Sequence, residues 1–256
     1  MNNNQHHVEA NQQHWDDAAQ RMVASGERLW AQSEPAWGLW ALPESDLRLL
    51  PADMAGMDAI ELGCGTAYVS AWMARRGARV MGIDNSSRQL ETARRLQTQH
   101  GLSLTLVRGD AEAVPFADAS FDFAISEYGA AIWCNPFTWI PEAYRLLRPG
   151  GELVFLGNHP LTLVCAPSNG AACDERLHAP YFGLHKRDWR TVEIDPGGVE
   201  FNLTLAAWLT LFRETGFDVL NYQELQAPHD ASGQRAMVSA SWGRQWPAEQ
   251  VWHLRK

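Results

Sequence analysis

The chain has 256 residues, of which 46% are hydrophobic and 20% charged, and its formal net charge is −9. This length allows one large α/β domain or two small ones with a sizeable buried core. The acidic excess argues against a general nucleic-acid binder, because that affinity depends on basic groups that meet phosphates.

The first fifty residues predict an N-terminal helical cap. The Asn-, Gln- and His-rich start, residues 1–13, is polar and is expected to fray. From residue 14 to residue 50 apolar side chains recur at a helical spacing, and Pro35 and Pro43 are expected to break this region into pieces. We therefore expect 1–50 to form a helical lid beside a core that spans 51–256.

Strands and helices alternate along the first part of that core. Short apolar runs predict strands, and the runs between them predict helices, with Ser86 as a helix cap. The strands are expected at 58–62, 78–83, 102–107, 121–126 and 152–156, and the helices at 67–76, 87–99 and 140–147. This alternation is typical of a parallel sheet with helices on both faces.

The pattern changes after the fifth of these strands. Residues 158–200 hold several prolines and the pair Gly197-Gly198, and they are too many for a plain connection of about 4 to 6 residues. We interpret them as an insertion that covers a site. A helix at 203–215, a strand at 217–222 and a last strand within 236–242 are expected to follow.

A glycine turn and an acidic residue form the most informative pattern. Gly63 and Gly65 follow the first strand, and Asp84 ends the next strand about 20 residues later. Glycine lets the backbone come close to a ligand because no Cβ intervenes, and the acid can accept both hydroxyls of a ribose. Together these residues predict a ligand of the adenosine type at the carboxyl ends of the strands.

The neighbouring residues favour one kind of adenosine ligand. A dinucleotide fingerprint has a third glycine where this chain has Tyr68. The turn offers no basic residue to hold a phosphate, and Glu61 adds negative charge beside it. A ligand with a cationic amino-acid end suits this turn better than a pyrophosphate does. A tight turn without any ligand is the alternative.

Four motifs in one register carry a family resemblance. The segments ELGCGTA, GIDNSSRQL, GDAEAVPFADASFD and RLLRPGGELVF resemble the successive motifs of class I S-adenosylmethionine-dependent methyltransferases, over residues 55–156. The chain is similar to the branch that methylates small molecules such as quinones and natural products. The resemblance implies a Rossmann-like sheet of seven strands, mostly parallel with one late antiparallel strand. It also implies S-adenosylmethionine as methyl donor and S-adenosylhomocysteine as product.

The matched positions imply a cofactor site. Glu61 and the glycine turn would line the methionine end, Asp84 would hold the ribose, and Asp110 would accept from the adenine amino group. The full set that the resemblance implies is Trp15, Glu61, Gly63, Cys64, Gly65, Thr66, Asp84, Asn85, Gln89, Asp110, Ala111, Glu112 and Ser126. The alternatives are a buried filler for Cys64, a turn residue for Asp110 and a solvated carboxylate for Glu112.

Methyl transfer depends more on the position of the nucleophile than on an acid catalyst. A nucleophile must be held about 3 to 3.5 Å from the methyl group. A base is needed if the acceptor is a phenol, an amine or an indole-like carbon. The candidates are His159, Tyr128 and Glu127, which follow the fifth and fourth strands. A mechanism by proximity alone, with no essential base, is the alternative.

Twelve tryptophans outnumber the nine phenylalanines and the five tyrosines, and they indicate aromatic walls. Trp37 and Trp40 fall in the cap, Trp133 after the fourth strand, and Tyr181 in the insertion, so we expect them to contact an acceptor. Ordinary packing is the alternative. The expected acceptor is an aromatic or heteroaromatic small molecule, methylated at C, N or O.

The remaining expectations concern partners and location. The start has no signal-peptide pattern, no apolar run reaches the roughly 18 to 20 residues of a membrane span, and the four cysteines form no CxxC pair. We expect a cytoplasmic monomer or homodimer that binds no metal, membrane or nucleic acid. The rival interpretations are an RNA or protein methyltransferase, a non-catalytic S-adenosylmethionine-binding protein and an NAD(P) oxidoreductase.

Overall fold

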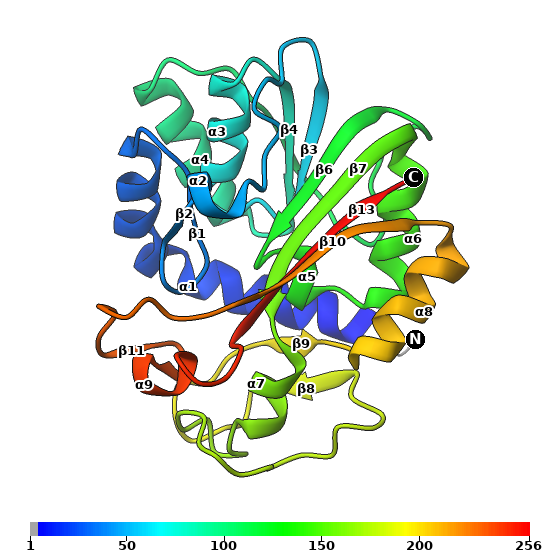
Figure 1. Cartoon of the computed structure of the whole chain (residues 1–256). Helices are drawn as coiled ribbons and strands as arrows, with labels where there is room; N and C mark the ends of the chain where they lie inside the picture. The colour runs from blue at the N-terminus through cyan, green and yellow to red at the C-terminus, as the bar shows by residue number, and fades with distance from the viewer. Residues whose placement is uncertain (1–4) are drawn as a thin grey trace.

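A seven-stranded sheet forms the centre of the computed structural model, which describes residues 5–256 (Figure 1). Its strands lie side by side in the order β10-β13-β7-β6-β3-β4-β5. They are β3 (Asp58–Leu62), β4 (Arg79–Asp84), β5 (Thr105–Arg108), β6 (Phe121–Glu127), β7 (Leu147–Asn158), β10 (Asp218–Leu225) and β13 (Glu249–Arg255).

One strand of this sheet runs against the others. β13 pairs antiparallel with both β7 and β10, whereas β3 pairs parallel with β4 and β6, and the pairs β4–β5 and β6–β7 are parallel as well. The predicted mostly parallel sheet with one late antiparallel strand is therefore confirmed.

The predicted position of that last strand is wrong. The segment 236–242 holds β12 (Val238–Ser239), which pairs with β11 (Gln234–Arg235), and the short helix α9 (Ala240–Gly243). Ser239 caps α9 by accepting a hydrogen bond from the Trp242 N–H, and Val238 and Trp242 are buried away from the central sheet. A serine cap thus turns an apolar run into a helix.

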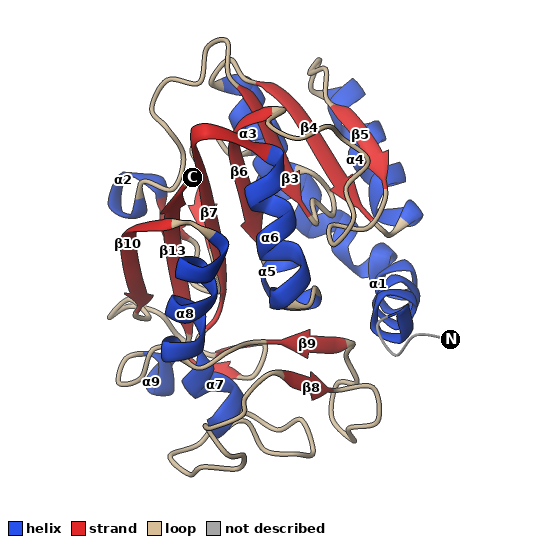
Figure 2. Ribbon diagram, turned by 90° about the vertical axis from the view of Figure 1, so that its right-hand side faces the viewer, coloured by secondary structure: helices blue, strands red, loops and turns tan. Residues whose placement is uncertain are grey.

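Helices cover both faces of the sheet (Figure 2). α3 (Tyr68–Arg75) and α4 (Ser87–Gln99) pack on one face, where they meet side chains such as Ala59, Phe123 and Ile125. α5 (Ala130–Trp133), α6 (Pro136–Leu146) and α8 (Leu205–Thr215) pack on the other face, where they meet Ile60 and Phe155. Neighbouring residues of a strand point to opposite faces, so each strand contributes side chains to both cores. The predicted α/β class is confirmed.

The helix caps explain where two helices begin. Ser86 accepts a hydrogen bond from the Gln89 N–H and starts α4, as predicted. α6 begins at Pro136, before the predicted residue 140, because Asn135 caps it by accepting from the Phe137 N–H. Proline is well suited to the first turn of a helix, where its missing N–H has no partner to lose.

The N-terminal region differs from the predicted series of helical pieces. One helix, α1 (Gln5–Ala31), takes up most of it, so the expected fraying is wrong for residues 5–13, and residues 1–4 lie outside the described residues. A hairpin of β1 (Ala36–Trp37) and β2 (Leu42–Pro43) follows, and then the short α2 (Glu44–Leu47). α1 crosses below the ends of the sheet strands in Figure 1 and packs against α3 and α4.

The segment predicted as an insertion lies outside the sheet, at the bottom of Figure 2. It contains α7 (Pro160–Cys165) and the paired strands β8 (Lys186–Asp188) and β9 (Val199–Phe201). Its apolar residues, among them Leu163, Cys173 and Trp189, form a third core together with Val238 and Trp242. This packing places β9 beside α1 and α5, at the carboxyl side of the parallel strands.

Among residues 5–256, no helix combines the length and the apolar character that crossing a membrane requires.

Candidate functional site

The glycine turn follows β3 and is held by the next strand. The N–H groups of Gly63 and Cys64 both donate to the carbonyl of Ile83, each at 2.9 Å. Gly63 has φ +77°, and a Cβ there would lie 2.7 Å from the Cα of Gly129. Gly65 also has a positive φ, +51°, but a Cβ there would meet no atom within 4 Å. The first glycine is thus required by close packing, and the second faces open space.

Asp84 joins the turn to the end of β4. Its Oδ2 accepts a hydrogen bond from the Gly65 N–H at 2.7 Å, and its Oδ1 accepts from the Ser86 N–H at 2.8 Å. Burial raises the pKa of Asp84 to about 6, although these two backbone hydrogen bonds oppose the shift. The predicted pairing of a glycine turn with an acid on the next strand is present in space.

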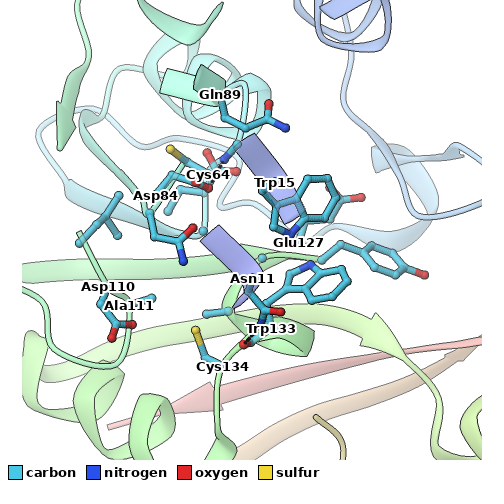
Figure 3. A pocket seen from close by; sticks show the side chains of 18 of the residues that line it. Asn11, Trp15, Cys64, Asp84, Gln89, Asp110, Ala111, Glu127, Trp133 and Cys134 are labelled. Atoms are coloured by element: carbon cyan, nitrogen blue, oxygen red, sulfur yellow. Dashed lines mark hydrogen bonds between the residues drawn. The ribbon is translucent and has the colours of Figure 1, made fainter. Parts of the chain in front are cut away.

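A cavity of about 150 Å³, the first cavity, opens beside this turn. In Figure 3, Asp84, Asp110 and Ala111 lie on one side of it, and Trp15 and Trp133 lie on the other. Eleven of the thirteen predicted cofactor residues line the cavity: Trp15, Glu61, Gly63, Cys64, Gly65, Thr66, Asp84, Asn85, Gln89, Asp110 and Ala111.

Two predicted cofactor residues do not line the first cavity. The buried Ser126 donates to the Leu62 carbonyl at 2.8 Å and accepts from the Ala131 N–H at 3.1 Å, so it ties β6 to β3. Glu112 accepts from the Asn135 N–H at 2.6 Å and lies 2.6 Å from Nε2 of His7. The hydroxyl of Ser126 and the carboxylate of Glu112 both bind other groups of the protein, and the cofactor roles of these two residues stay predictions.

Several polar groups of the first cavity have no partner within residues 5–256. The Oε1 atom of Gln89 is buried without a hydrogen bond, and so is the indole Nε1 of Trp133. The N–H of Ala111 donates no hydrogen bond, while that of Glu112 donates to Asp110 Oδ1 at 2.9 Å. Buried polar groups normally have partners, so these atoms are placed to bind a ligand with both donors and acceptors.

Glu61 lies at the end of the cavity near α3. Its Oε2 accepts from the N–H of Ser70 at 2.7 Å and from the Ser70 hydroxyl at 2.5 Å. Burial raises the pKa of Glu61 to about 8, because the charged form has lost its water. A cation beside this carboxylate would favour its charged form.

The sequence did not identify the contribution of the N-terminal residues. Val8, Asn11 and Met22 of α1 also line the first cavity. Asn11 donates to the carbonyls of Trp133 and Val199, both at 2.9 Å, and accepts from the Val199 N–H at 2.7 Å. One asparagine thus joins α1 to the loop after β6 and to β9. Its position in a polar start gave no signal of this role.

A second cavity of about 700 Å³ adjoins the first. Its walls come from α1, the β1–β2 hairpin, the loop after β6, β9 and residues 235–238. The two cavities share seven lining residues, which are Trp15, Met22, Thr66, Tyr68, Glu127, Tyr128 and Trp133. The two cavities are therefore neighbours, and ligands in each of them would contact these same seven residues.

Glu127 and Tyr128, two of the predicted catalytic residues, belong to the shared wall. Glu127 Oε1 accepts from the Gly38 N–H at 3.1 Å, and its Oε2 accepts from the Tyr68 hydroxyl. Burial raises the pKa of Glu127 to about 7, and it raises that of Tyr128 well above its ordinary value. Glu127 therefore titrates near neutral pH, which suits a general base. Tyr128 stays protonated and can only donate or accept a hydrogen bond.

The third predicted catalytic residue, His159, is not at either cavity wall. It caps α7, where its Nδ1 accepts from the Leu161 N–H at 3.1 Å, and its Nε2 lies 3.2 Å from Glu224 Oε1. Burial lowers the pKa of His159. Its two ring nitrogens both have partners within the protein, so the geometry does not support a catalytic base at this position, which stays a prediction.

One of the four residues predicted to contact an acceptor lines the cavities, and three do not. Trp133 lines both cavities. Trp37 is fully buried and donates to Glu44 Oε2 at 2.8 Å, and Trp40 packs against the third core. Tyr181 is exposed, and its hydroxyl accepts from the Leu205 N–H at 3.1 Å. Trp37, Trp40 and Tyr181 line neither cavity, so the geometry does not support their contact with an acceptor, which stays a prediction.

Within the described residues, no three His, Cys, Asp or Glu side chains gather in a way that would suit a metal ion.

Comparisons with known proteins concern the family of the chain. A family model described as a methyltransferase domain matches residues 60–155. The malonyl-[acyl-carrier protein] O-methyltransferase of Pseudescherichia vulneris is 31% identical over 201 residues, which cover 75% of this chain and 78% of that protein. The chloroplastic 2-methyl-6-phytyl-1,4-hydroquinone methyltransferase 2 of Oryza sativa subsp. japonica is 34% identical over 128 residues, 48% of this chain and 36% of that protein.

The comparison with solved structures concerns the fold alone. An S-adenosylmethionine-dependent methyltransferase from Mesorhizobium loti is 24% identical, with a TM-score of 0.66, over 82% of this chain and 95% of that one. Five curated relatives, the rice enzyme among them, are matched over only 26% to 47% of their own length. The long match to the Pseudescherichia protein, the matched domain model and the shared fold lead to one conclusion: the chain belongs to the class I S-adenosylmethionine-dependent methyltransferase family.

Proposed function

We propose that the protein transfers a methyl group from S-adenosylmethionine to a small-molecule acceptor. The observation that carries this proposal is the joining of two cavities of different character. The first has the glycine turn, Asp84 and unpartnered polar atoms, and the second is larger and bounded by the cap and the insertion. A donor and an acceptor would meet at the shared wall.

The residues of the first cavity fit S-adenosylmethionine. Each carboxylate oxygen of Asp84 accepts only one backbone hydrogen bond, so each has capacity left for a ribose hydroxyl. Asp110 and the free N–H of Ala111 offer an acceptor and a donor, which is what the edge of an adenine needs. Glu61 would receive the ammonium of the methionine end, which would favour the charged form of this buried carboxylate.

The cofactor supplies an activated methyl group when bound, and the protein positions the acceptor. Trp15, Trp133 and Tyr128 form a largely aromatic wall that keeps water from the meeting point. Holding a nucleophile about 3 to 3.5 Å from the methyl group accounts for most of the catalysis. Glu127 lines both cavities, and its carboxylate is available to take a proton from the acceptor.

The acceptor is proposed as a small molecule because of the cavity and the charge. The relatives act, by their names, on acceptors as different as malonyl-[acyl-carrier protein] and a hydroquinone, so a name does not transfer to this chain. The net charge of −9 disfavours RNA as the acceptor.

A ligand screen tests the proposal. S-adenosylhomocysteine and NAD are compared by thermal shift and then by calorimetry. We expect stabilisation by S-adenosylhomocysteine with about one molecule bound per chain, and none by NAD. Stabilisation by NAD alone would overturn the proposal. Tight binding of S-adenosylmethionine without methyl transfer to any acceptor would favour a non-catalytic binding protein instead.

A further inference from the structure

Three acidic side chains surround the second cavity. Glu127 and Glu200 line it, and Glu249 lies behind Tyr128, whose hydroxyl donates to Glu249 Oε1 at 2.7 Å. Glu200 is 7% exposed and Glu249 is fully buried, while Glu127 is half-buried. Burial and the charges of all three carboxylates raise the pKa of Tyr128, which lines the same cavity.

Only neutral groups bind these carboxylates within residues 5–256. Glu200 Oε2 accepts from Trp189 Nε1 at 2.9 Å and from Asn158 Nδ2 at 3.5 Å. Glu249 Oε1 also accepts from the Leu39 N–H at 2.9 Å, and its Oε2 has no partner. None of the ion pairs in the described part of the chain includes Glu127, Glu200 or Glu249.

In their charged form these carboxylates have no ion-pair partner among the described residues. Burying a carboxylate without a cation is costly, and burial raises the pKa of Glu200 and of Glu249 to about 7 each. The Oε1 atom of Glu200 accepts no hydrogen bond from the described residues, although this side chain lines the cavity. An unpartnered oxygen on a buried acid marks a place for a ligand that donates.

The nearest basic residues do not neutralise this interior. Arg28 and Arg235 also line the second cavity, but both are exposed, and their guanidinium groups donate to Ser25 and to the Gln234 carbonyl. Arg187 is the cross-strand partner of Glu200 in the β8–β9 pair, and its charge lowers the pKa of Glu200. Its guanidinium lies over the Trp189 ring, 4.7 Å from the ring centroid, and forms no ion pair with Glu200. Arg187 therefore offsets part of the charge of Glu200, whereas Arg28 and Arg235 stay at the exposed rim and no described cation forms an ion pair with Glu127, Glu200 or Glu249.

Aromatic rings complete the setting for a cation. Trp15 and Trp133 meet edge to face with their ring centroids 5.3 Å apart, and both line the two cavities. Tyr68 and Tyr128 join them on the shared wall. Aromatic faces attract ammonium groups, and the same rings give apolar contact to an organic body.

We propose that the acceptor is an organic amine, bound as an ammonium in the second cavity with its nitrogen against Glu127 and with Glu200 adding negative charge, and that the enzyme methylates this nitrogen. The inference rests on the proposed methyl transfer and names its substrate class. Glu127 is the residue placed to act, because it is the only one of the three carboxylates that lines both cavities in the described part of the chain.

The reaction balances with these groups. The ammonium gives one proton to the Glu127 carboxylate, which frees the nitrogen lone pair. The nitrogen then forms a bond to the methyl carbon as the bond from that carbon to sulfur breaks, and the sulfur keeps the electron pair. The products are the N-methylated ammonium and S-adenosylhomocysteine, and Glu127 later releases its proton to water.

The test compares matched ligands on the complex with S-adenosylhomocysteine. A panel of small aryl and alkyl primary amines, such as 2-phenylethylamine, is titrated by calorimetry beside the alcohols of the same shape, such as 2-phenylethanol. We expect the amines that bind to do so about tenfold or more tightly than their alcohols, as one charge-assisted hydrogen bond predicts. Mass spectrometry with labelled methyl donor should then find the label on nitrogen.

Substitutions test which carboxylates cause the preference for amines. Glu127→Gln and Glu200→Gln should each remove most of the preference for amines, whereas Glu175→Gln, an exposed acid of the insertion, should keep it. The inference would be overturned if the alcohols or phenols of the panel had the same affinity as the amines. It would also be overturned if the affinity for the amines were unchanged in both glutamine variants. Titration of S-adenosylhomocysteine alone separates the two proposals, because its failure would contradict the methyl transfer and its success would leave only the acceptor class at stake.

Discussion

Asn11 on α1 and Val199 on β9 form a paired contact between segments 188 residues apart in the chain. The asparagine Nδ2 donates to the Val199 carbonyl at 2.9 Å, and its Oδ1 accepts from the Val199 N–H at 2.7 Å. The next residue, Glu200, lines the second cavity. This contact therefore joins the helix that lines the first cavity to the strand that carries Glu200 in the wall of the second.

Asn11→Ala should loosen this connection. It leaves the Val199 N–H and two carbonyls without partners, and we expect a loss of about 1 to 3 kcal/mol in the free energy of unfolding. Amide exchange in α1 should rise in the same variant. Gln13→Ala, an exposed neighbour that binds Asp17, serves as the control and should change neither quantity. Unchanged exchange in α1 would show that other contacts hold the helix.

Asp84→Ala should weaken binding of S-adenosylhomocysteine by about 1 to 3 kcal/mol through the lost charge-assisted hydrogen bonds. The variant also loses the contacts to the Gly65 and Ser86 N–H groups, so its folded fraction is measured first by circular dichroism. Calorimetry then compares it with Asp230→Ala, which removes an exposed acid far from these contacts. Equal affinity in the two variants would refute the ribose assignment.

The two glycines of the turn should respond differently to alanine. Gly63→Ala places a Cβ 2.7 Å from the Gly129 Cα and from the Ala130 nitrogen, where only backbone could move, so we expect it to unfold the protein or lower its melting temperature strongly. Gly65→Ala meets no atom, and the positive φ should cost about 1 to 2 kcal/mol. Its Cβ points toward the first cavity, so its main effect should be weaker cofactor binding. Thermal unfolding and calorimetry measure the two effects separately.

Stability should fall as the pH rises from about 5 to 8. The folded-state pKa of Glu249, about 7, is higher than its ordinary value of 4.5, so the folded protein holds a proton that the unfolded chain releases. The stabilisation is complete below pH 4.5 and is lost as the pH passes the folded value. Glu249→Gln should reduce this decline by an amount on the order of a few kcal/mol in unfolding free energy. Chemical denaturation at several pH values measures the free energy of unfolding. An equal decline of this free energy with pH in the unmodified protein and in Glu249→Gln would contradict the assignment.

Two tryptophans distinguish packing from binding. Trp37→Phe should lower stability and leave ligand binding unchanged, because this ring is fully buried beside Trp72 and Glu44. Trp133→Phe should weaken binding in both cavities with a smaller loss of stability, since it lines both walls and its Nε1 has no partner in the described chain. If Trp37→Phe weakened ligand binding and Trp133→Phe lowered only stability, Trp37 would be favoured as the acceptor contact.

Short-range patterns were sufficient to predict six of the seven strands of the sheet and the glycine turn. The strand at 58–62, the Ser86 cap and the approach of Asp84 to Gly65 depend on residues close in sequence or on neighbouring parallel strands. The strand at 249–255 was missed, because its Glu249 and Gln250 are polar yet fully buried between other groups. Periodicity does not reveal a buried acid whose partners lie on distant segments.

The candidate site was predictable only where the chain matches a motif. The residues at the carboxyl ends of β3 and β4 fell where expected, whereas His159 and Trp37 did not line a cavity. Their local sequences resemble those of site residues, but a helix cap occupies the imidazole and a hairpin buries the indole. Asn11 and Glu200, by contrast, gain their positions from a contact across the fold that no window of sequence contains.

The position of β13 also determines when the molecule can be completed. This strand follows every other strand of the sheet in the chain, yet it lies between β7 and β10, and β10 pairs with no other strand of the sheet in the described structure. A nascent chain that stops before Glu249 cannot attach β10. Tyr128 then also lacks Glu249, the carboxylate that accepts the hydrogen bond of its hydroxyl group. Because β13 is synthesised after every other strand of the sheet, the edge strand β10 and the carboxylate that binds Tyr128 can join the fold only after the glycine turn and the other five strands of the sheet have been made.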